Sequence, residues 1–237
     1  MTLVQICTNI KICTNSYNYL MTPKPSSKCY AVITADIVGS RRIQSFRSKR
    51  DRHLAAVSRL HLTQKRILSP YTVTVWDEFQ VILRKPDYVP DVILDLRRLF
   101  YPFSLWIAVG MGSVSGARRK PVNLYAGGEA FQRARKAADR LKLGSPKYRI
   151  LTSFESGIEI FDSIANTIYR LQDALLERTT ARQWATINMQ FKTSRQEQTA
   201  RKLSLDISTV SRNLKRGYFW HLVETAGTMK RIMQAYF

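Results

Sequence analysis

The chain has 237 residues, 45% of them hydrophobic, and its 38 Lys and Arg residues against 17 Asp and Glu residues give a formal net charge of +21. This length suits one sizeable core with a smaller companion, and the positive charge favours a polyanionic partner such as DNA, RNA, a nucleotide or an anionic lipid. No run of about 18 apolar residues is present, so no membrane-spanning helix is expected. The three cysteines have neither paired nor zinc-type spacing, which indicates a reduced, cytoplasmic protein.

Residues 1–28 differ in composition from the rest of the chain. They contain a doubled ICTN and a segment rich in Pro, Ser and Lys that opens with a second methionine, Met21. We expect a weakly ordered tail, with a short N-terminal strand as the alternative.

The next elements alternate between strand and helix patterns. An apolar run, CYAVITADIVGS (residues 29–40), predicts a buried strand that ends near Asp36, and residues 41–68 have helical spacing of apolar residues. The stretch YTVTVWDEFQVIL (71–83) predicts a hairpin with Asp77 and Glu78 at its turn, and 88–100 predicts an amphipathic helix.

A second strand and helix follow. FSLWIAVGMGSVSG (103–116) reads as a strand, 124–144 as a helix that begins after two glycines and stops at Gly144, and KYRILTS (147–153) as a last strand. This order predicts an α+β, ferredoxin-like or palm-like βαββαβ domain over residues 29–153. We expect a connecting helix over 154–178 and an all-helical domain over 179–237.

The C-terminal domain has the spacing of a helix-turn-helix. Ala200 provides the small residue where two helices cross, Val210 and Leu214 face the core, and Ser204 occupies a turn position that often has glycine. The second helix is expected to begin near Ile207 with Ser208 as its cap. Its side chains that are predicted to contact DNA are Ser208, Thr209, Ser211, Arg212, Lys215 and Arg216. The alternative is a solvated basic helix in a plain bundle.

Acidic residues define a second candidate site. Asp36 ends the first strand, and Asp77 and Glu78 lie in a hairpin that would pair beside it, so the three carboxylates could converge on Mg²⁺ or Mn²⁺ bound to a nucleotide. Candidate phosphate contacts are Arg41, Arg42, Gly127 and Gly128.

Four motifs in this order, ADIVGS, WDEFQ, MGSVSG and YAGGEAFQRARKA, resemble the SatD family. The resemblance covers residues 29 to about 218 and implies a domain similar to the class III nucleotidyl cyclase and GGDEF palm, with Asp36 and Asp77 as counterparts of the metal-binding acids. Trp76 replaces the glycine that precedes the hairpin acid in the family pattern, and this change argues against catalysis.

We expect a DNA-binding transcriptional regulator whose palm-like domain senses a nucleotide or forms a homodimer. The alternative is a metal-dependent nucleotide-processing enzyme that uses Asp36 and Asp77. A third reading is a scaffold whose acids only neutralise neighbouring arginines, which would place an arginine between Asp36 and Asp77.

Overall fold

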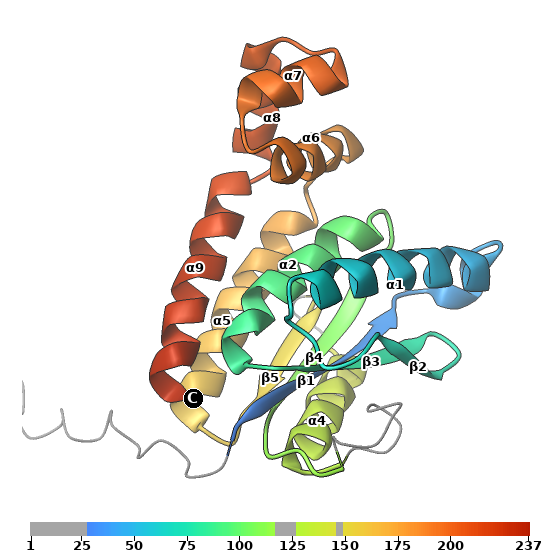
Figure 1. Cartoon of the computed structure of the whole chain (residues 1–237), viewed down its shortest axis with the longest axis vertical. Helices are drawn as coiled ribbons and strands as arrows, with labels where there is room; N and C mark the ends of the chain where they lie inside the picture. The colour runs from blue at the N-terminus through green and yellow to red at the C-terminus, as the bar shows by residue number, and fades with distance from the viewer. Residues whose placement is uncertain (1–27, 117–126, 146–148) are drawn as a thin grey trace, which may run out of the picture.

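The computed structural model describes residues 28–116, 127–145 and 149–237, and it shows a mixed β-sheet with helices on both faces and a further group of helices at one end (Figure 1). The α+β class predicted from the sequence is confirmed. The predicted tail lies outside the described residues except for Lys28. Within the described ranges, no helix combines the length and the apolar character needed to cross a membrane.

The sheet is built around its first strand. Its strands are β1 (Tyr30–Ile37), β2 (Thr72–Val75), β3 (Glu78–Leu83), β4 (Leu105–Gly112) and β5 (Thr152–Glu155), in the spatial order β2-β3-β1-β4-β5. β1 pairs antiparallel with both β3 and β4, and β5 joins β4 in parallel. β1 is buried from Ala31 to Ala35, as expected for a strand covered on both faces. The predicted position of the first strand beside the hairpin is confirmed.

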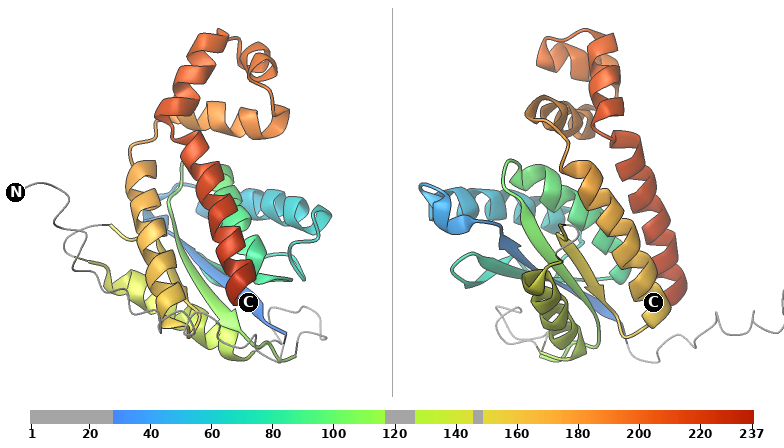
Figure 2. Two further views of the ribbon diagram at one scale, coloured as in Figure 1. Left: turned by 90° about the vertical axis from the view of Figure 1, so that its left-hand side faces the viewer. Right: turned by 180° about the vertical axis from the view of Figure 1, so that it is seen from behind.

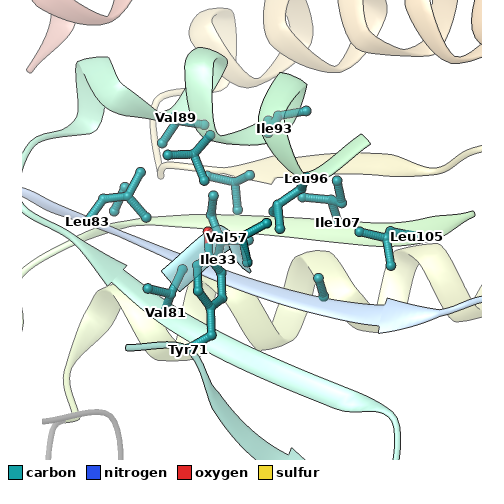
Figure 3. Packing of buried hydrophobic residues seen from close by; sticks show 14 of the residues in the cluster. Ile33, Val57, Tyr71, Val81, Leu83, Val89, Ile93, Leu96, Leu105 and Ile107 are labelled. Atoms are coloured by element: carbon teal, nitrogen blue, oxygen red, sulfur yellow. The ribbon is translucent and has the colours of Figure 1, made fainter. Parts of the chain in front are cut away.

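Helices cover both faces of this sheet. They are α1 (Phe46–Thr63), α2 (Val89–Phe100), α4 (Glu129–Leu143), α5 (Glu159–Leu176) and α9 (Phe219–Tyr236), with short 3-10 helices at Ser40–Arg42 and Pro86–Tyr88. α1, α2 and α5 lie on one face, α9 packs against α2 and α5, and α4 lies on the other face (Figures 1 and 2). In the main core, Val57 of α1 and Leu96 of α2 meet Ile33 and Ile107 of the sheet (Figure 3).

A glycine allows α4 to approach the sheet closely. A Cβ atom on Gly110 of β4 would lie 2.1 Å from the backbone oxygen of Ala130 and 2.1 Å from the backbone nitrogen of Ala134. Only a residue without a side chain fits between strand and helix at that separation. This contact places the C-terminal half of α4 beside the end of β1 that holds Asp36.

Three further helices form a small unit with its own core. α6 (Ala181–Thr193), α7 (Gln196–Leu203) and α8 (Ile207–Arg216) pack around Trp184 and Ile187, and the predicted core positions Ala200, Val210 and Leu214 are buried there.

In the turn between α7 and α8, Ser204 adopts a left-handed conformation with φ of 51°, which glycine would adopt without a side-chain penalty. The start of α8 departs from the sequence prediction in one detail. The N-cap of α8 is Asp206, and Ser208 lies inside the helix, so the predicted cap was wrong. The aspartate takes this role because its backbone is extended just before the first helical residue, Ile207.

The last helix returns to the sheet. Met229 and Met233 of α9 belong to the same core as β1, and so do Phe161 and Tyr169 of α5. The core of the sheet unit therefore includes residues from both the predicted connecting helix and the predicted 179–237 unit. The proposed domain division itself stays a prediction.

Candidate functional site

Two acids from separate elements meet at one end of the sheet. Along β1, Ala35 and Ile37 face the main core, so alternation turns Asp36 toward the α4 side. Asp77 is in the turn between β2 and β3, and its carboxyl group is close enough to hydrogen-bond that of Asp36. The pairing of β1 with β3 explains this proximity, because Asp36 lies directly across from Glu78, the residue after Asp77.

The pair is electrostatically unusual. Burial, followed by the neighbouring charge of Asp77 and the hydrogen bond to it, raises the pKa of Asp36 to about 6, and Lys142 on α4 opposes the shift. The Oδ1 atom of Asp36 is buried and accepts no hydrogen bond in the described parts of the chain. Asp77 is held by Ser40, whose hydroxyl donates to its Oδ2 atom. A buried carboxylate oxygen without a partner is costly unless a cation or donor completes it.

Glu78 is adjacent but serves another set of contacts. Its Oε1 atom accepts a hydrogen bond of 2.8 Å from Thr74, and its Oε2 atom lies 3.7 Å from Arg135 and 4.0 Å from Lys142. Across residues 28–116, 127–145 and 149–237, no group of three or more acidic, His or Cys side chains is arranged to hold a metal. The structure therefore brings Asp36 and Asp77 together and leaves Glu78 beside them, bound to cationic side chains.

No arginine or lysine of the described ranges forms an ion pair with Asp36 or Asp77, although Lys142 acts on Asp36 from a longer distance. Within the described ranges, neither Asp36 nor Asp77 has a cationic nitrogen within 4.0 Å, whereas buried Asp173 is bound by Arg97 at 2.6 Å. A purely structural role would place an arginine between the two acids, and the structure shows no such arginine in the described ranges. The residues fit a divalent cation, because Mg²⁺ is commonly held by one or two carboxylates with waters and ligand phosphates as the remaining ligands.

The hairpin accommodates Trp76 without backbone strain. Trp76 and Asp77 form the turn, and neither has a positive φ. A register shift between Val73 and Val75 bends β2 instead. The glycine expected at position 76 is therefore not required by this turn.

A comparison with protein-family models matches residues 30–219 to the SatD family. The chain belongs to the SatD family. A search of curated proteins found no match. The family resemblance drawn from the four sequence motifs is thus confirmed over most of the chain.

The prediction of a DNA-binding transcriptional regulator is wrong on this finding. The comparison supports SatD membership alone, and that membership provides no DNA-binding regulator function. The error has a physical cause: helix-turn-helix spacing and a basic outer helix face also occur in helical bundles that contact no DNA. On α8 of this SatD-family chain, Ser208, Ser211, Arg212, Lys215 and Arg216 are exposed and Thr209 is partly buried, as a solvated helix face also requires.

The predicted phosphate contacts lie at two separate places. Arg41 and Arg42 follow Ser40 directly and are exposed, so they are near the carboxyl pair. Gly127 and Gly128 precede α4 next to the end of β4, which pairs with the start of β1 at the opposite end of the sheet from Asp36. Gly127 also uses both backbone groups in a bridge to Ser115.

The sequence singled out Arg47 and Arg50 only as part of a possible anion-binding surface, and the contacts around the hairpin turn were not predicted. Ser40, Phe46, Arg47 and Arg50 all contact Trp76 or Asp77. The hydroxyl of Ser40, directly after the Asp36 strand and Gly39, is the one signal that could have indicated a second residue of the site.

Proposed function

We propose that this SatD-family protein binds a nucleotide together with Mg²⁺ or Mn²⁺ at the Asp36 and Asp77 pair. The observation on which the proposal rests is the buried Oδ1 atom of Asp36, which has no hydrogen-bond partner among the described residues and lies beside the carboxyl group of Asp77, with which no described basic side chain forms an ion pair. A bound divalent cation would supply the positive charge that both carboxylates lack. Phosphate oxygens and water would complete its coordination shell.

Neighbouring charges support a phosphorylated ligand. Arg41 and Arg42 are exposed on the segment that also positions Ser40, and the whole chain has a net charge of +21. A basic surround raises the local concentration of anions and accelerates their association. Asp36 and Asp77 would hold the cation, Ser40 would orient Asp77, and the two arginines would contact phosphate oxygens.

The proposal includes an architecture. We assign the sheet unit to a palm-like arrangement, because a central strand and the adjoining hairpin each contribute one acid at the same end. We also assign α7 and α8 to a helix-turn-helix arrangement. In the proposed division into residues 29–153, 154–178 and 179–237, the last segment contains the α6–α8 unit together with α9, which packs back on the core of the first segment.

Isothermal titration calorimetry with Mn²⁺ and a non-hydrolysable nucleoside triphosphate tests the function. Wild type should bind the metal-nucleotide complex, and Asp36→Asn should weaken binding at least about tenfold because a carboxylate ligand is lost. Glu177→Gln, which changes an exposed acid that follows α5 and is ion-paired with Arg149, is the matched control and should bind as wild type does. Equal affinity of wild type and Asp36→Asn would overturn the proposal.

A further inference from the structure

The turn that contains Asp77 also presents a large aromatic side chain. The Trp76 side chain is 49% exposed although it is apolar, and it immediately precedes Asp77 in the turn. Its indole is held in place by Phe46, whose ring lies 6.2 Å away at an interplanar angle of 13°. Phe46 is itself buried at the start of α1. The indole is therefore an exposed but well-supported aromatic surface.

The backbone of the same turn is also anchored. Nη1 of Arg50 donates to the backbone oxygen of Trp76, and Nε of Arg50 donates to Asp51 at 2.8 Å. The first bond connects the turn to α1, and the second joins Arg50 to its neighbour within that helix. A fixed aromatic ring loses little entropy when a planar ligand stacks on it.

The planar guanidinium group of Arg47 lies over the Trp76 ring, where a planar ligand would stack. Its guanidinium carbon lies 4.3 Å from the centroid of the Trp76 ring. The Arg47 side chain is exposed, and no carboxylate among the described residues forms an ion pair with it. An exposed cation–aromatic contact is broken at small cost, since such contacts contribute about 0.5–1 kcal/mol at exposed sites.

We infer that Trp76 is the base-stacking residue for the nucleotide bound at the Asp36 and Asp77 pair, so that the ligand is a nucleotide recognised through its aromatic base as well as its phosphates. The inference rests on the proposed function. The base takes the place of the Arg47 guanidinium over the indole. The released guanidinium joins Arg41 and Arg42 as a contact for the phosphates.

Stacking on an indole makes a specific prediction about selectivity. Every nucleobase has a π face, so stacking stabilises all four nucleotides and favours the larger purines. Inorganic triphosphate has the same phosphate groups but no base. The change that Trp76→Ala causes in the affinity difference between a nucleotide and triphosphate therefore isolates the contribution of Trp76.

The test measures binding of ATP and of inorganic triphosphate, each with Mn²⁺, to the full chain. Wild type should bind ATP about tenfold more tightly than triphosphate. Trp76→Ala should reduce ATP affinity to the level of triphosphate and leave triphosphate affinity unchanged, and Trp76→Phe should retain most of the difference. Trp220→Ala, which removes another exposed tryptophan, is the matched control. Quenching of tryptophan fluorescence by ATP should persist in Trp220→Ala and fall sharply in Trp76→Phe.

The outcomes separate the two proposals. If triphosphate binds in a manner that Asp36→Asn abolishes, but ATP binds no more tightly than triphosphate, the stacking role is overturned and the metal-phosphate site stands. If neither ligand binds, or if Asp36→Asn changes neither affinity, both proposals fail. If Trp76→Ala weakens ATP and triphosphate equally, Trp76 supports the hairpin and does not contact a base.

Discussion

Asp36 and Asp77 are brought together from the end of one strand and the turn after another, close enough to share a hydrogen bond, and no basic side chain in the described ranges is paired with either. Two neighbouring carboxylates repel each other once both are ionised. The fold therefore holds two carboxyl groups at a distance where their repulsion lowers the stability of the protein. Such destabilising contacts are common in binding sites.

Removing the charge of Asp36 should therefore stabilise the unliganded protein. Asp36→Asn keeps the shape of the side chain, and we expect the free energy of unfolding at pH 7.5 to rise by about 1 kcal/mol, a figure reduced for the partial exposure of the site. Urea denaturation followed by circular dichroism measures it. A loss of more than about 1 kcal/mol would mean that the carboxylate has a structural role instead.

The stabilisation by Asp36→Asn should depend on pH. The pKa of Asp36 is raised from 3.8 to about 6 in the folded protein, so ionisation costs folded-state stability as pH rises between these two values. The difference in the free energy of unfolding between Asp36→Asn and wild type should be largest above about pH 6 and should decrease as pH falls toward 4. Urea denaturation of both proteins across this range measures that difference. A difference that is constant with pH would contradict the raised pKa.

A buried ion pair links α2 to α5. Nη2 of Arg97 lies 2.6 Å from Asp173, and Asp173 also accepts hydrogen bonds from Leu151 and Thr152. Because truncating one partner leaves the other charge buried and unpaired, Arg97→Met should destabilise the fold by about 3–5 kcal/mol. Thermal and urea unfolding measure the loss. Arg149→Met, which breaks an exposed ion pair with Glu177, should cost less than about 1 kcal/mol.

Gly110 and Gly127 provide a matched pair of glycine substitutions. A Cβ atom at Gly110 would meet backbone atoms of α4 at 2.1 Å, whereas the nearest atom at Gly127 is the Ser115 hydroxyl at 3.8 Å. Gly110→Ala should cost about 3 kcal/mol or more because strand and helix must separate, and Gly127→Ala should cost less than about 1 kcal/mol. Similar losses in both variants, measured by urea denaturation, would show that the β4 and α4 contact is not tightly packed.

The strands and the meeting of Asp36 with Asp77 could be predicted from local patterns. Apolar runs identify buried strands, and a strand that pairs with the adjoining hairpin brings its terminal acid near the turn. The contacts of Glu78 could not be predicted, because Arg135 and Lys142 come from α4, more than fifty residues later, and nothing local shows which face of the sheet that helix covers.

The regulator prediction had a different weakness. The apolar positions of α7 and α8 report how two helices pack, and the structure confirms that packing at Ala200, Val210 and Leu214. Their exposed side chains report only that the outer face is solvated. Packing and solvation together do not identify a ligand, whereas a buried carboxylate oxygen without a hydrogen-bond partner among the described residues, such as Oδ1 of Asp36, favours a cation or a hydrogen-bond donor as the ligand.

The return of α9 to the sheet makes the α6–α8 unit an insertion with two attachments. α5 leads into it and α9 leads out of it, so that α5 ends and α9 begins at the same end of the sheet unit (Figure 1). Ending the chain after residue 178 would remove Met229 and Met233 and uncover the core beneath them. Joining α5 to α9 by a short linker would instead delete the unit and keep that core covered, so internal excision is the way to separate the Asp36 and Asp77 pair from the helical unit.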